Sequence, residues 1–166
     1  YLSYLFGWFY LWTVSPKWQM PETPPLSLIL MGAAGVAVLA GCGVMEKLVR
    51  GLRQQRDAGL GAGFYLAAAL GALQVGLTGW ALWQAELAPT QTSHDAVMLV
   101  GLVYALFHGG LAVILTVLQG LRVGYGYVGA HAPFEPGVVA LLWRYNVVTF
   151  GLLIGALAVL PRVLGG

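Results

Sequence analysis

Five apolar stretches separated by short polar loops fill nearly all of this 166-residue chain. A helix that crosses the hydrocarbon core of a bilayer, about 30 Å thick, needs roughly 20 apolar residues at about 1.5 Å each. Only the first stretch is too short for this. In chain order, the expected spans are 1–14, 26–45, 61–83, 96–121 and 138–163.

Composition excludes an ordinary water-soluble fold. Only 8% of the residues are charged, against roughly a quarter in soluble domains, and the mean hydropathy is +0.80. Because every backbone N–H and C=O needs a partner inside lipid, we expect helices rather than strands. The sequence predicts one all-α domain, a polytopic membrane helix bundle with five transmembrane helices. The first helix begins abruptly at Tyr1, so we expect it to be truncated and the chain to belong to a longer one.

Charge in the loops predicts an orientation. The basic residues that follow the second and fourth spans are Lys47, Arg50, Arg53, Arg56 and Arg122. The other side holds only Lys17 and Arg162. By the positive-inside rule, the second and fourth loops face the cytoplasm and the C-terminus lies on the outer side. Glycines and alanines repeat along the second and third spans, which predicts close helix packing.

Ionisable residues inside a membrane are functional candidates, because burying them is costly. His108 lies in the middle of the fourth span, and Arg144 lies in the first third of the fifth. His108 is either a neutral imidazole bonded to a neighbouring helix or a functional group. Arg144 cannot lose its proton, so it snorkels to the cytoplasmic face, pairs with an acid such as Glu135, or holds a lipid phosphate. Gln74 and Thr78, one turn apart, are expected to hydrogen-bond across helices.

The same survey predicts neither a catalytic nor a metal site on this chain. A haem with two axial histidines needs two at bilayer depth, and His94 and His131 are expected in loops on opposite sides. The sequence contains no clustered metal ligands, phosphate-binding glycine loop or nucleophile motif. A net charge of +2 is too small to suggest nucleic-acid binding.

Several segments resemble subunit III of haem-copper respiratory oxidases. Residues 106–110 (LFHGG) resemble the family's Phe-His-Gly-x-His motif, and residues 142–148 (LWRYNVV) resemble its Tyr-Trp-His-Phe-Val-Asp-Val-Val stretch. Between them, His131 and Phe134-Glu135 match a loop histidine followed by Phe-Glu. Residues 6–12 (FGWFYLW) are similar to a glycine-aromatic helix of the family, and Leu70-Gly71 with Gln74 to another.

The chain departs from the family pattern at several positions. The second histidine of the first motif is Leu111, the histidine of the later stretch is Arg144, and its aspartate is Val147. An acidic residue expected near Thr78 is absent. The resemblance, which follows the chain in order, is therefore to a divergent member, either a separate subunit or the C-terminal part of a fusion with subunit I.

The resemblance implies an accessory subunit of a proton-pumping cytochrome c or quinol oxidase, without an active site of its own. Such a subunit packs on catalytic subunit I beside subunit II, binds phospholipids and supports proton uptake and stability. Haem and copper belong to the partner subunits, and the expected location is the inner membrane of a bacterium. His108, Glu135, Arg144, Gln74 and His131 become the candidate lipid or interface residues.

Two other functions remain open from the residues. A small transporter or channel would use a path around His108, Thr116 and Thr149, but the inverted repeats or broken helices typical of transporters are not evident. A haem-binding membrane anchor is disfavoured by the single deep histidine.

Overall fold

The computed structural model describes residues 2–15, 27–54, 59–128 and 134–156, and these consist of five helices and their connections. The helices are α1 (Leu2–Val14), α2 (Leu28–Arg53), α3 (Leu60–Gln84), α4 (Ser93–Gly124) and α5 (Phe134–Ile154). The last four are long and apolar enough to cross a membrane. The described part of the chain is thus an all-α, integral membrane protein, as the sequence predicts.

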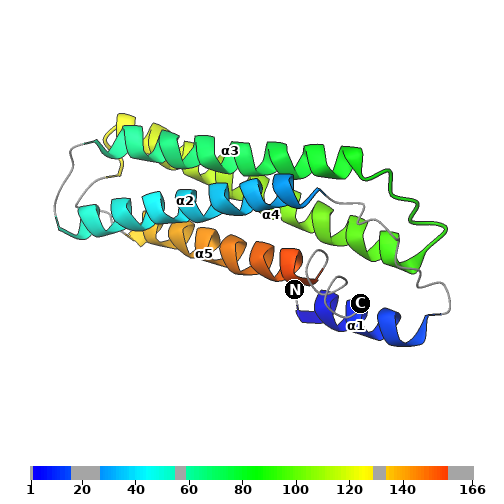
Figure 1. The fold of residues 1–166 in the computed structure, drawn as a ribbon. Helices are drawn as coiled ribbons and strands as arrows, with labels where there is room; N and C mark the ends of the chain where they lie inside the picture. Colours follow the sequence, from blue (N-terminus) through cyan, green and yellow to red (C-terminus); the bar gives the residue numbers. More distant parts are fainter. Residues whose placement is uncertain (1, 16–26, 55–58, 129–133, 157–166) are drawn as a thin grey trace.

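The four long helices form an antiparallel ring. Helix α2 packs against α3 and α5, and α4 packs against α3 and α5, so that α2 lies diagonally across from α4. The end of α2, the start of α3, the end of α4 and the start of α5 gather at one end (Figure 1). Lys47, Arg50, Arg53 and Arg122 lie there, and we call it the basic end. Both loops that carry the charge bias of the sequence therefore connect helices at one end of the bundle.

Helix α1 has 13 residues, too few to cross a bilayer alone, and lies outside the ring against α4. It sits beside the start of α4 and the end of α5 (Figure 1). The Tyr4 hydroxyl donates to the backbone oxygen of Val97 at 3.0 Å. Gly101, one turn further along α4, leaves room for that hydroxyl, because a Cβ there would overlap it. Tyr4 therefore anchors α1 to α4 through a position where α4 has no side chain.

Several helix boundaries differ from the expected spans, because polar caps extend the helices beyond their apolar parts. Helix α2 continues eight residues past 45, to Arg53, and the Arg50 and Arg53 side chains near its C-terminus complement the helix dipole. Helix α5 begins at Phe134 instead of 138, with Glu135 and Pro136 in its first turn, where proline loses no helical hydrogen bond. The final residues of the expected fifth span lie outside the described ranges.

Trp143 occupies the centre of the ring. Its side chain is fully buried, and Nε1 donates to Thr116 Oγ1 on α4 at 2.9 Å. A Cβ at Gly41 on α2 would overlap its ring, and one at Gly71 on α3 would lie 3.0 Å from it. One α5 side chain thus meets the other three long helices. The expected close packing at small residues is confirmed at these positions, where glycines let a large aromatic ring fill the space between backbones.

Candidate functional site

A cluster of His108, Tyr104 and Tyr145 joins α4 and α5 on the outer surface of the bundle. The two tyrosine hydroxyls hydrogen-bond to each other across the helices. The ring centroid of His108 lies 4.0 Å from that of Tyr104 and 5.5 Å from that of Tyr145. We call these three residues and the neighbouring Phe107, whose ring lies 5.2 Å from His108, the α4/α5 face.

The backbone determines the tautomer of His108. Its Nδ1 lies 3.0 Å from the carbonyl oxygen of Tyr104, one turn earlier. Because a carbonyl can only accept, Nδ1 carries the proton and donates it, so that in a neutral ring the lone pair lies on Nε2. Among the described residues, no hydrogen bond reaches Nε2. Of the two interpretations of His108, the neutral imidazole is consistent with this geometry, but its bond is to its own helix.

The position of the α4/α5 face is unusual for polar side chains. His108 lies halfway along the 32-residue α4, which is the depth of the bilayer centre for a spanning helix. Tyr104 and His108 are partly exposed, Tyr145 is 37% exposed and Phe107 is 66% exposed. The face therefore presents hydroxyl and imidazole groups sideways, where lipid tails offer no hydrogen bonds.

Arg144 pairs with an acid other than the one expected. Its Nε lies 2.6 Å from Glu46 Oε1 and its Nη2 lies 2.9 Å from Glu46 Oε2, a bidentate pair between α5 and α2. Glu135 instead bonds Arg122 of α4, with Nη1 to Oε2 at 2.5 Å. The prediction that Arg144 pairs with Glu135 is therefore wrong. Because α5 starts at Phe134, Glu135 lies a full nine helical residues from Arg144, nearly 14 Å along the axis at about 1.5 Å each.

Both ion pairs link neighbouring helices near the basic end. Arg144 and Glu46 clamp α5 to α2, whereas Arg122 and Glu135 clamp α4 to α5. Arg122 and Glu135 lie near helix ends, where water and headgroups weaken their attraction. Arg144 lies midway along α5, so its pair with Glu46 is deeper and partly faces lipid. Each pair links two helices in one register and neutralises its glutamate.

Gln74 and Thr78 bond within α3 and not across helices, contrary to expectation. Thr78 Oγ1 donates to the Gln74 carbonyl at 2.8 Å, and Gln74 Nε2 donates to Thr78 Oγ1 at 3.5 Å. The Gln74 Oε1 atom is buried without a hydrogen-bond partner in the described structure and points at Gly109 of α4. Gln74 is thus a buried packing residue. The candidate His131 lies outside the described residues.

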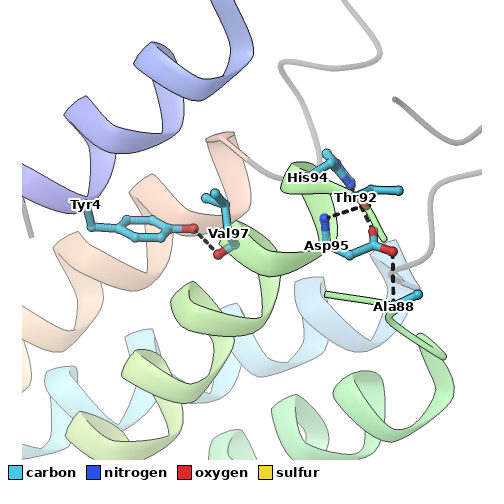
Figure 2. Close-up of polar contacts among 6 residues, drawn as sticks. All are labelled: Tyr4, Ala88, Thr92, His94, Asp95 and Val97. Carbon is cyan, nitrogen blue, oxygen red and sulfur yellow. Dashed lines mark hydrogen bonds and ion pairs between the residues drawn. The ribbon is translucent and has the colours of Figure 1, made fainter. Parts of the chain in front are cut away.

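A polar cluster at the opposite end of the bundle was missed from the sequence (Figure 2). Thr92 caps α4 by accepting from the Asp95 amide at 3.1 Å, and Asp95 Oδ2 accepts from the Ala88 amide at 3.1 Å. His94 lies in the first turn of α4, not in a loop, and its Nδ1 is 3.2 Å from Asp95 Oδ1. The Thr-x-x-Asp spacing is a capping signal that could have predicted this helix start. His94 is buried, so this cluster ties the α3–α4 turn together.

In the described ranges, no three His, Cys, Asp or Glu side chains gather as a metal site would require. No protein-family model matches the chain, and no curated protein matches it. The resemblance to oxidase subunit III therefore stays a prediction from the motifs.

Proposed function

We propose that this chain is a non-catalytic transmembrane subunit of a proton-pumping haem-copper oxidase, resembling subunit III, in the inner membrane of a bacterium. The basic end faces the cytoplasm and the C-terminus the outer side. Its role is to cover and stabilise the catalytic subunit I, beside subunit II, and to support proton uptake there. Haem and copper belong to those partners, and phospholipid binds to this chain.

The observation that carries the proposal is the meeting of the two motif segments. Residues 106–110 on α4 and 142–148 on α5 carry the strongest resemblance, and His108 and Tyr145 from them lie with ring centroids 5.5 Å apart. Because α4 and α5 are consecutive antiparallel helices, the two segments lie at similar depth, and the rotation of each helix turns His108 and Tyr145 toward the same surface. Two similar segments that meet at one surface support a shared role for that surface.

The chemistry of the α4/α5 face supports a protein partner. The two tyrosine hydroxyls bond each other and His108 Nδ1 bonds the Tyr104 carbonyl, but hydrocarbon offers no partner to His108 Nε2. A helix from another subunit that offers a hydrogen-bond donor to His108 Nε2 supplies that partner. On the inner side of α5, by contrast, Trp143 Nε1 finds its acceptor within this chain, at Thr116 Oγ1. The α4/α5 face is therefore the side on which we dock subunit I.

The proposal is tested by purifying the affinity-tagged protein from its native membranes. The expected result is a large multi-helix partner in the mass spectrum and haem a or haem o bands in the reduced-minus-oxidised spectrum. A solitary, haem-free oligomer would overturn the proposal and favour a small transporter or channel.

A further inference from the structure

A cavity of about 700 Å³ lies between α2 and α3 at the basic end. The cationic side chains of Lys47 and Arg50 line it. Gln54, the last residue of the described range 27–54, lines it too. The cavity is open on one side. Both Lys47 and Arg50 are exposed there. We call it the α2/α3 groove.

Among the described residues, the charge that lines the groove is positive. Its eleven described lining residues include Lys47 and Arg50 but no aspartate or glutamate. The two described carboxylates of the basic end, Glu46 and Glu135, are occupied by Arg144 and Arg122. Arg50 uses its Nε to donate to the Glu46 carbonyl oxygen at 3.3 Å, which leaves its terminal nitrogens free to bind an anion.

The rest of the groove is apolar and has an open glycine wall. Leu48, Leu60 and Leu66 line it together with four glycines. At Gly43 a Cβ would meet nothing within 4 Å, so the groove there is empty space and not a packed interface. A ligand that fits has an anionic group at the basic end and a hydrocarbon part that runs toward the bilayer centre.

We infer that the α2/α3 groove binds an anionic phospholipid, with its phosphate between Lys47 and Arg50 and an acyl chain along Gly43 and Leu66. Basic pockets between transmembrane helices hold anionic headgroups in this way. A free phosphate would satisfy the two cations, but it would leave the leucine and glycine walls uncovered. The inference depends on membrane insertion of the chain and not on the oxidase assignment.

The test is a lipid titration of the full-length protein, purified in detergent with its native subunits and followed by native mass spectrometry. We expect phosphatidylglycerol to bind more tightly than phosphatidylcholine, and inorganic phosphate not to displace it. Each cation near an anionic headgroup contributes about 1 kcal/mol, so replacing both (K47Q/R50Q) should weaken phosphatidylglycerol binding by about tenfold or more.

A steric variant tests the same site without changing charge. Gly43→Leu places a side chain in the groove without a clash, so it should exclude the lipid while the helix still folds. Gly32→Leu is the matched control, because Gly32 lies on the same helix outside the groove and has equally open space. Arg122→Gln is the control for loss of one cation at the basic end outside the groove.

Three results would overturn the inference. If K47Q/R50Q and Gly43→Leu both bind phosphatidylglycerol as the unaltered protein does, the lipid does not bind in the α2/α3 groove. Equal binding of phosphatidylcholine would remove the anionic selectivity. Displacement by inorganic phosphate alone would identify a soluble phosphate ligand in place of a lipid. A failed oxidase assignment would change none of these outcomes.

Discussion

Trp143 and Tyr145 lie two residues apart on α5 and face opposite environments. Trp143 is fully buried, its ring is received by glycines of α2 and α3, and its Nε1 bonds Thr116. Tyr145 is 37% exposed, its hydroxyl bonds Tyr104 of α4, and its ring lies 5.5 Å from that of the partly exposed His108. The two sides of one helix therefore differ: Trp143 on the inner side finds its hydrogen-bond acceptor within this chain, whereas His108 Nε2 on the outer side has none among the described residues.

This difference separates residues that fold the chain from residues that join it to something else. Substitutions on the inner side should lower the stability of the isolated protein. Substitutions on the outer side should leave that stability nearly unchanged and alter association with a partner. The predictions that follow test this separation, in order of decreasing effect on stability.

The largest effect is expected at Trp143. Trp143→Ala leaves a cavity between four helices and removes the hydrogen bond to Thr116, and should lower the free energy of unfolding by about 3 kcal/mol or more. Unfolding in mixed detergent and SDS, followed by circular dichroism, measures this loss of stability.

Gly41→Leu should be comparably damaging, because even its Cβ overlaps the Trp143 ring, whereas Gly32→Leu on the same helix should be tolerated. Equal stability of Gly41→Leu and Gly32→Leu would contradict the packing described.

A smaller loss is expected when only the indole hydrogen bond is removed. Thr116→Val keeps the shape of the side chain but removes the acceptor of Trp143 Nε1. Hydrogen bonds between membrane helices contribute about 0.6 kcal/mol on average and rarely more than about 2 kcal/mol. The same unfolding assay should show a loss in this range. A change as large as that of Trp143→Ala would mean that Thr116 has a further packing role.

The Glu46–Arg144 pair should contribute less to stability and more to helix register. Because Arg144 is exposed on the outside of the bundle, its side chain can extend toward the headgroups once Glu46 is replaced, so Glu46→Gln should shift the unfolding curve only slightly. In a Cys42→Ala background, cysteines placed at Gly43 on α2 and Val148 on α5 should still report a change in the α2–α5 distance when Glu46 is replaced, measured by spin-label spectroscopy. The charge-swapped variant E46R/R144E should restore the distance, whereas an unchanged distance in Glu46→Gln would exclude a role in register.

The smallest effect on the isolated chain is expected at the α4/α5 face. His108→Leu replaces a lipid-facing imidazole by an apolar side chain and should leave the unfolding free energy unchanged or raise it. The same variant should reduce co-purification of the partner subunit from native membranes. Val103→Leu, an apolar change at an exposed position of α4, is the control and should affect neither measurement. A strongly destabilised His108→Leu would show that His108 serves the fold of this chain.

The sequence predicted the helices well and the contacts between them poorly. Length and hydropathy placed all five helices, because a bilayer requires long apolar segments whatever their neighbours. The partners of the charged side chains were harder to predict. Glu46 and Arg144 are 98 residues apart, and only the rotation of α2 and α5 around their axes brings them together. Glu135 looked like the natural partner because it is closer in sequence. The packing of Trp143 against Gly41 and Gly71 likewise depends on three helices at once. The glycines alone could be recognised in the sequence as residues that permit close packing.

The most direct test of the central claim is a site-specific photo-crosslink in native membranes. A benzophenone amino acid at Phe107, on the α4/α5 face, should link this chain to a large haem-containing subunit, identified by mass spectrometry. The same probe at Leu73, an exposed position of α3, is the control and should yield mainly lipid adducts. Crosslinks to a haem subunit from Phe107 alone are the predicted result. Only lipid adducts at Phe107, or the same protein captured equally at Leu73, would contradict the account.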